Sequence, residues 1–247
     1  MSSYALLSKD SNVDFMIKGL FSYDFFGHTV WITTSHVCIL IVLLLIITFG
    51  IFANRSIRKA AQVPASEMKV PGTFQNIVEI VVEMLDNMVT NVMGKNAPKF
   101  ANYIGTIFIF ILISNLSGLL GLRPPTADYG TTLPLGLITF CLIFYNKIKY
   151  QKVSGFLKGL CDPWPIWAPI NVIGDVAVPI SLSLRLFANV LSGTVMMALF
   201  YGLLRIFVKV GIPAALHLYF DVFSGAIQTY VFCMLTMTYI TDAIGES

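Results

Sequence analysis

The 247-residue sequence contains few charged residues and no grouping of side chains typical of a metal site. Charged side chains make up 12% of the chain and hydrophobic residues 56%, whereas soluble globular domains have roughly 25% charged residues. The net charge of +3 is small and spread over loops, which argues against nucleic acid as a partner. The composition, with a mean hydropathy of +0.78, predicts a polytopic membrane protein.

Cysteine and histidine patterns are missing as well. Without a CxxC or a Cys/His cluster, neither a zinc site nor a disulfide framework is predicted, and nothing indicates a cofactor. No HExxH or GxSxG motif occurs, and the three histidines are scattered near the ends of apolar segments. An intramembrane enzyme would need a nucleophile beside a base, or a metal cluster, at membrane depth. The four cysteines, none close to another, are Cys38, Cys141, Cys161 and Cys233.

Apolar runs predict an all-α fold of about five membrane-crossing helices plus one amphipathic surface helix, in a single membrane domain (1–247). A span needs about 20 apolar residues. Basic clusters after residues 53 and 146 place the N-terminus outside and the C-terminus in the cytoplasm by the positive-inside rule. The expected order is an external segment (1–29), a span (30–53), an amphipathic cytoplasmic helix (73–93), two spans (100–122 and 131–146), a long tilted helix (165–207) and a last span (212–241).

The amphipathic segment 73–93 differs from the spans because acids interrupt it. Two interpretations stay open: a helix on the cytoplasmic surface or against a partner, and an ordinary connector between spans. The apolar stripe expected on it consists of Ile77, Ile80, Val81, Met84, Leu85, Met88 and Val92.

The run 170–207 is too long for one upright span. As a continuous helix it would be about 57 Å long, nearly twice the hydrocarbon thickness of about 30 Å. It is either two spans with an unmarked turn or one steeply tilted helix. The lack of a Gly/Pro/Asn turn cluster favours the tilted helix, which then forms a long tilted hairpin with the last span.

Arg185 lies in the middle of this run. A guanidinium keeps its proton in proteins, and a cation at bilayer depth is costly. Arg185 therefore needs a counter-charge, a water-filled pocket or a partner subunit. Ser181, Arg185 and Asn189 recur every four residues and form one polar stripe on a helix.

Further polar residues occur at membrane depth. On the last span Asp221, Ser224 and Gln228 share one helical face. Asp175 lies about 15 Å before Arg185 along the helix and roughly 80° around it. Direct pairing of these two residues is therefore not expected, and Asp175 is a candidate for a separate aqueous pathway.

Several motifs together resemble subunit a of F-type ATP synthases. The strongest is the run 179–189, Pro-Ile-Ser-Leu-Ser-Leu-Arg-Leu-Phe-Ala-Asn, preceded by Pro169-Ile-Asn171 and Asp175. The resemblance covers the chain from residue 30 onward, with the motifs in the right order. Supporting motifs are Ser114-Asn115, Thr126-Ala-Asp128, Gly225-Ala-Ile-Gln-Thr-Tyr-Val-Phe232 and Leu235-Thr-Met-Thr-Tyr239.

This resemblance implies an ion channel in two offset half-channels, pressed against a rotating ring of c subunits. Arg185 would meet the ring carboxylate, and Asn189 and Gln228 would orient the two charges. Asp221 and Asp175 would belong to the ion path. Residues implied to line the half-channels are Asn115, Asp128, Ser181, Ser224 and Thr194.

The resemblance also implies the setting. The expected partners are the c-ring, the b subunits of the peripheral stalk and the lipid bilayer, most simply a bacterial plasma membrane. The expected ion is the proton, whose movement is coupled to ATP synthesis or hydrolysis. Bond chemistry would take place on the soluble head, so the chain itself is not expected to be an enzyme.

The chain departs from the family pattern at three positions. Ala188 stands where members commonly have glycine, and Val178 where many carry lysine. Thr194 stands nine residues after the arginine, where many have glutamate. Asp221 on the facing helix is the expected replacement for that acid; alternatively, it is an acid stabilised near a helix N-terminus.

A secondary transporter that binds a small anion at Arg185 is the alternative function. Such folds usually contain two related halves and helices interrupted by glycine. The sequence has no internal repeat and an odd number of expected spans.

Overall fold

The computed structural model describes residues 19–25, 28–61, 72–120, 122–160, 164–203 and 215–245. Five helical stretches in this part of the chain are long and apolar enough to cross a membrane. This confirms the predicted all-α membrane fold. Residues 1–18 of the expected external segment, and residues 204–214 at the end of the long helix and the start of the last span, lie outside the described residues.

The helices follow the order expected from hydropathy. The stretch from Thr73 to Leu120 holds two helices, because Gly94 at φ +52° separates them in a conformation that favours glycine. The α-helices are α1 (Thr34–Ala61), α2 (Thr73–Met93), α3 (Ala97–Leu116), α4 (Tyr129–Leu160), α5 (Ala168–Leu203) and α7 (Gly225–Ile244). Shorter elements are the 3₁₀ turns η2 (Gly94–Asn96), η3 (Ser117–Leu120), η4 (Pro125–Ala127) and η5 (Pro165–Trp167), and the π-helix η7 (Leu218–Ser224).

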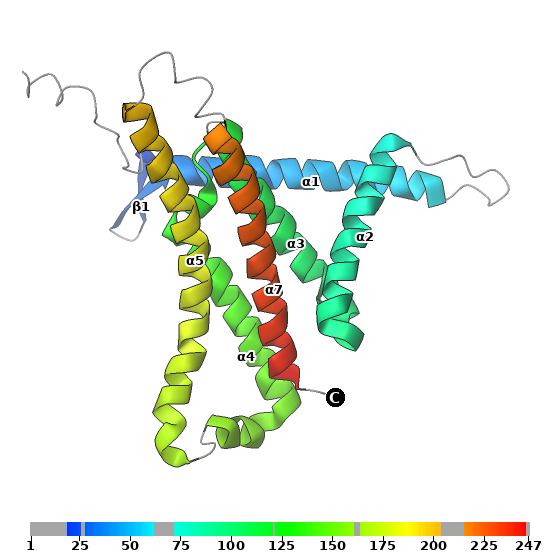
Figure 1. Ribbon diagram of the computed structural model, residues 1–247, viewed down its shortest axis with the longest axis vertical. Coiled ribbons are helices and arrows are strands. Elements are labelled where there is room, and N and C mark those ends of the chain that lie inside the picture. The colour runs from blue at the N-terminus through cyan, green and yellow to red at the C-terminus, as the bar shows by residue number, and fades with distance from the viewer. Residues whose placement is uncertain are drawn as a thin grey trace, which may run out of the picture.

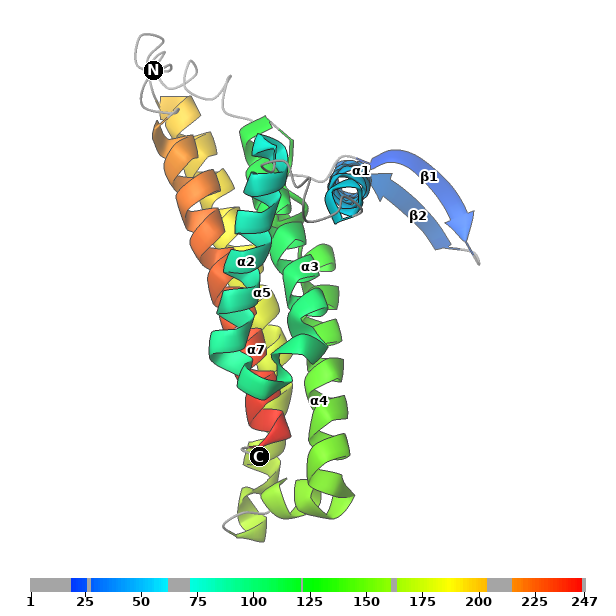
Figure 2. The same cartoon turned by 90° about the vertical axis from the view of Figure 1, so that its right-hand side faces the viewer.

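A β-hairpin precedes α1 and was not predicted. Strands β1 (Gly19–Phe25) and β2 (His28–Thr33) pair antiparallel, with Tyr23 opposite Val30. Aromatic and β-branched residues, which favour strands, fill both segments. Residues 30–33, expected at the start of the first span, therefore belong to β2 (Figure 2).

Helix α1 runs across the other helices instead of alongside them (Figure 1). It is therefore little buried: Cys38, Val42 and Ala53 are covered, whereas Leu44 and Phe52 are exposed. In a membrane protein such an apolar surface faces lipid or a partner.

The core is centred on α3 and α7, with buried residues added by α2 and α5 and with α4 packed against it. Helix α7 contacts each of the four other helices of this bundle. Polar side chains are also buried here, because hydrocarbon outside the bundle offers them no hydrogen bonds. Fully covered side chains include Ile104, Ile111, Leu182, Leu186, Phe232, Met237, Thr139, Thr229 and Thr236.

Helix α2 coincides with the segment expected to be amphipathic, but its buried face is not the expected stripe. Val78, Leu85, Val89 and Met93 are the buried residues. Of the expected stripe, Leu85 is buried and Met88 and Val92 are half-buried, whereas Ile77, Ile80, Val81 and Met84 are exposed. Apolar residues occur on both faces, so periodicity alone does not identify the packed one.

Helices α4 and α5 approach each other closely at Gly136. A Cβ atom at this position would lie 2.7 Å from the Pro179 carbonyl oxygen and 3.2 Å from Ser183 Cβ. Small residues allow such close backbone approach in membrane bundles. Despite Pro179, α5 continues for 36 residues, as the prediction of one long helix requires.

We expect Gly136→Ala to destabilise the chain. The added methyl would collide with backbone, and overpacking costs about 1–3 kcal/mol. Thermal unfolding in detergent, followed by circular dichroism, should show a midpoint several degrees lower than for the control Gly174→Ala. A methyl group added at Gly174, on α5, would meet no atom of a neighbouring element within 4 Å. Equal midpoints for the two variants would show that α4 and α5 can separate at no cost.

Candidate functional site

Arg185 lies on an exposed face of α5. No residue in the described part of the chain forms an ion pair or hydrogen bond with its side chain. Ser181, one turn earlier, is exposed as well, whereas Asn189, the third residue of the predicted stripe, is half-buried. Among the described residues, the Arg185 guanidinium therefore has no counter-charge.

Asn189 joins α5 to the π-helix η7. The Ser224 hydroxyl donates a hydrogen bond of 3.1 Å to Asn189 Oδ1. One turn further along α5, Gly193 packs against Phe220 of the same π-helix. The two arms of the predicted hairpin are therefore in contact next to Arg185.

Gln228 lies one turn after Ser224 and is 8% exposed. Its amide nitrogen has no hydrogen-bond partner among the described residues. A buried donor without a partner costs about 1–3 kcal/mol, which marks Gln228 as an unusual polar residue inside the bundle.

Asp221 pairs with His217, which the sequence analysis did not select. His217 Nδ1 lies 2.7 Å from Asp221 Oδ2, and the two side chains are 33% and 17% exposed. The carboxyl group packs on Gly118, where an added Cβ would be 3.2 Å from Asp221 Cγ. The i, i+4 spacing could have identified this pair, and π-helical segments are frequent at functional sites.

Thr194, at the position where the resemblance leads us to expect a glutamate, forms a hydrogen bond within α5. Its hydroxyl donates to the Leu191 carbonyl oxygen at 2.8 Å within α5. This bond satisfies the hydroxyl donor within its own helix.

Asn115 forms a buried clamp between α3, η4 and α7. Its amide nitrogen donates to the Gly225 carbonyl at 3.1 Å and to Thr229 Oγ1 at 3.4 Å. Its amide oxygen accepts a 2.7 Å bond from Thr126 Oγ1. Asn115 is 3% exposed, and Gly225 is close enough that an added Cβ would touch it at 3.0 Å. The geometry assigns Asn115 a packing role at minimum.

Asp128 lies at the start of α4, and its Oδ1 accepts a 3.0 Å bond from the Gly130 N–H. Such bonds satisfy free N–H groups at a helix start. With Ser35 and His36 at the start of α1, Asp128 lines a cavity of about 350 Å³. The buried hydroxyl of Ser35 has no described hydrogen-bond partner.

Asp175 pairs with Lys147 of α4. The lysine Nζ lies 2.8 Å from Asp175 Oδ2 and 3.1 Å from Oδ1. Together with Asp242 of α7, the pair lines a second cavity, of about 170 Å³. Asp175 is therefore separate from Arg185, as the helical geometry predicted, but its partner on another helix was not foreseen.

Metal binding finds no support in these residues. Within the described ranges, no three histidine, cysteine, aspartate or glutamate side chains are grouped closely enough to hold an ion.

Comparison with known proteins gives a consistent match. Residues 36–241 match the family described as ATP synthase A chain. The chain is 38% identical over 194 residues to the sodium-ion-specific ATP synthase subunit a of Propionigenium modestum, an alignment that covers 72% of this chain and 66% of that protein. It is 36% identical over 218 residues to ATP synthase subunit a 3 of Pelobacter propionicus, covering 86% and 87%. For subunit a of Desulforamulus reducens the values are 36% over 180 residues, 71% and 69%.

The Asn115 clamp should contribute measurably to stability. Thr126→Val leaves the Asn115 amide oxygen without its donor, and Asn115→Leu leaves the Gly225 carbonyl without that amide. We expect each to lower the free energy of unfolding in detergent by about 1–3 kcal/mol. The double variant should lose less than the sum, because both changes break one network. The control is Ser192→Ala, whose exposed hydroxyl bonds only to the Asn189 carbonyl of its own helix. Strictly additive losses would contradict the clamp.

Proposed function

Because the chain belongs to the family of ATP synthase subunit a, we propose that it carries ions past a ring of c subunits through two offset half-channels. At the level of the family, it is a membrane-embedded subunit of the synthase, and its function is ion translocation coupled to the enzyme complex. The proposal concerns three further points: the path of the ion through the chain, the contact with the ring, and the identity of the transported ion.

The observation that carries the proposal is the exposed, unneutralised Arg185 in a candidate membrane span. A fixed cation attracts a ring carboxylate and favours its ionised form. The bound ion then leaves into one half-channel, and the same cation blocks a direct leak between the two. The ring must rotate to reload, and each charge that crosses yields about 2.3 kcal/mol per 100 mV.

Neighbouring side chains support a path along which ions could reach the ring carboxylate opposite Arg185. Asn189 uses its amide oxygen for Ser224, so its amide nitrogen can orient the incoming carboxylate. Asp221 lies three residues before Ser224, on the π-helix that Asn189 contacts. We propose that the Asp221–His217 pair serves the outer half-channel in place of the family's glutamate. In this route Asn115, Asp128 and Gln228 are lining or orienting residues, and Asp175 serves the inner side.

Helix lengths suggest how the chain lies in the bilayer. The apolar part of α1, 22 residues, is about 33 Å long and matches a hydrocarbon core of about 30 Å. Helix α5 is about 54 Å long and fits only if it is steeply inclined. Since α1 runs across α5 (Figure 1), we propose an upright α1 and an inclined α5–α7 hairpin. The N-terminus would be outside, and the C-terminus in the cytoplasm of a bacterial cell.

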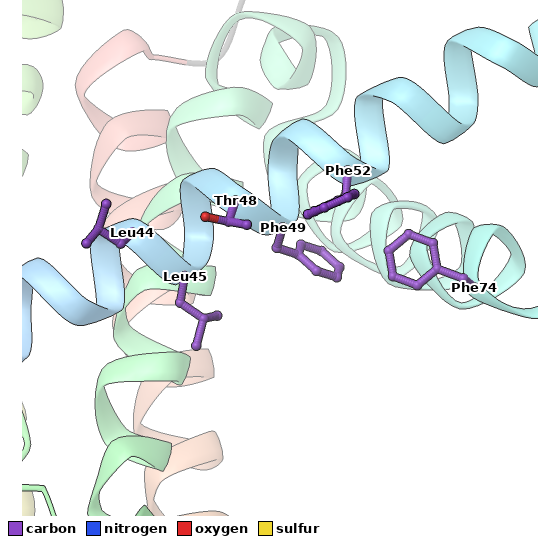
Figure 3. A pocket seen from close by; sticks show the side chains of 6 residues that line it. All are labelled: Leu44, Leu45, Thr48, Phe49, Phe52 and Phe74. Atoms are coloured by element: carbon purple, nitrogen blue, oxygen red, sulfur yellow. The ribbon is translucent and has the colours of Figure 1, made fainter.

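A groove between α1 and α2 suits a second partner. Phe49 packs edge-on against Phe74 with ring centroids 5.7 Å apart, beside an apolar hollow of about 690 Å³ (Figure 3). It is lined by residues of α1 and by Phe74 near the start of α2, with none from α5 (Figure 3). We propose that the membrane helix of a b subunit packs here, where it leaves the Arg185 face free for the c-ring.

The decisive test is ATP-driven ion pumping by inverted membrane vesicles. We expect Arg185→Ala to abolish pumping while the complex still assembles. Arg185→Lys should also impair it, because lysine keeps the charge but not the planar fork. Leu199→Ala, at an exposed apolar position of the same helix, is the control. Pumping that persists in Arg185→Ala would favour the anion-transporter alternative.

The same vesicles identify the ion. The expectation of protons predicts acidification without sodium and its collapse by a protonophore. A requirement for sodium, with ²²Na⁺ uptake that survives the protonophore, would instead match the sodium-specific relative.

The acid of the outer half-channel can be tested separately. We expect Asp221→Asn to lower pumping at least about ten-fold, since a relay needs a group that exchanges its charge state. Thr194→Ala should change it little, because the threonine hydroxyl bonds within its own helix. The reverse pattern would refute the replacement of the glutamate by Asp221.

A further inference from the structure

We propose that Lys147 is a positioning residue that holds the Asp175 carboxylate at the inner mouth of the ion path. The inference rests on the proposed function and adds to it a residue on α4, outside the α5–α7 hairpin. It begins from the ion pair between these two side chains and the cavity they line.

The geometry of the pair fixes the carboxylate. Lys147 Nζ bonds both oxygens of Asp175, at 2.8 Å and 3.1 Å, so the carboxylate cannot turn without breaking a bond. The side chains are 25% and 38% exposed. Ion pairs with this degree of exposure contribute roughly 0–1 kcal/mol to the stability of a protein. The pair therefore adds little to the stability of the fold, and the inference concerns where it places the carboxylate.

The oriented carboxylate of Asp175 faces a cavity that can hold water. Its volume of about 170 Å³ is room for roughly five water molecules. Lys147, Asp175, Tyr239 and Asp242 are the titratable groups that line it, from α4, α5 and α7. Lys147 is the only cation among these described lining residues, and two of the others, Asp175 and Asp242, are acids.

The backbone near Asp175 is also polar. Pro179 has no N–H, so it cannot donate to the Asp175 carbonyl one turn earlier in α5. This carbonyl adds a hydrogen-bond acceptor to those of the side chain. An ion path entering α5 from the inner side would find oxygens of both kinds at this residue.

Val178 provides a way to test the role. It lines the same cavity and lies three residues after Asp175 on α5. A lysine at position 178 would be an i, i+3 neighbour of the carboxylate. Lys147 thus supplies from α4 a cation that α5 itself could carry.

The test uses the whole synthase in inverted vesicles, with ATP hydrolysis and subunit content as measures of assembly. We expect Lys147→Met to lower coupled pumping at least about three-fold, as misplaced functional groups do, and Lys147→Arg to retain it. Adding Val178→Lys to Lys147→Met should restore pumping. The neutral pair Lys147→Met/Asp175→Asn and the exchanged pair Lys147→Asp/Asp175→Lys should assemble but stay impaired, because neither keeps an oriented carboxylate on α5.

Restored pumping in the neutral or exchanged pair would overturn the proposal, since any uncharged or reversed tie would then suffice. Unchanged pumping in Lys147→Met would overturn it as well. Arg185→Ala in the same preparation separates the two levels: if it abolishes pumping and Lys147→Met does not, only this inference fails. If Arg185→Ala still pumps, the proposed function fails.

A second measurement covers a Lys147→Met complex that does not assemble. In a background without native cysteines, a charged thiol reagent added on the inner side should block pumping in Val178→Cys. Ile173→Cys is the control, because Ile173 is 68% exposed on α5 and does not line the cavity. Equal responses of the two variants would overturn the assignment of the cavity to the path.

Discussion

The charge on Arg185 is the constraint that the rest of the bundle accommodates. Its guanidinium stays protonated, and the described chain does not neutralise it. A cation at the centre of a bilayer costs at least about 2.5–3.5 kcal/mol on insertion scales. Helix α5 therefore divides its surface: Leu182 and Leu186 enter the core, while the arginine remains on the open side. One face of α5 is thus packed into the core, and the face that carries Arg185 is exposed.

The positions of the polar groups inside the bundle also follow from the properties of the membrane as a solvent. Hydrocarbon offers no hydrogen bonds, so polar groups gather where helices meet. Asn115 joins three elements, and Asn189 joins the two arms of the hairpin. Lys147 and Asp175 join α4 and α5 where water can reach them. These directional polar contacts help to fix the relative positions of the helices, which apolar packing alone specifies less strictly.

Hydropathy and charge were sufficient to predict the number and order of the helices, because each span needs a fixed length of apolar chain. The lack of turn residues was sufficient for the unbroken α5. Periodicity failed on α2, since Ile77 and Val78 are equally apolar and only packing decides between them. The β-hairpin was missed because its aromatic residues also suit a membrane interface. At the site, Arg185 and Asp221 stood out as charges in apolar runs, whereas Lys147 stood among several lysines of a loop-like segment. Pairing across helices, as between Lys147 and Asp175, cannot be read from spacing along one helix.

If the proposed function holds, the close approach at Gly136 has a mechanical consequence for a subunit that stays fixed while a ring turns beside it. The Pro179 carbonyl faces Gly136 with no side chain between the two backbones, six residues before Arg185. A sideways load on α5 therefore meets main chain rather than flexible side chains, which would yield and absorb it. At this contact α4 therefore supports α5 through main-chain atoms, close to the residue that carries the fixed charge.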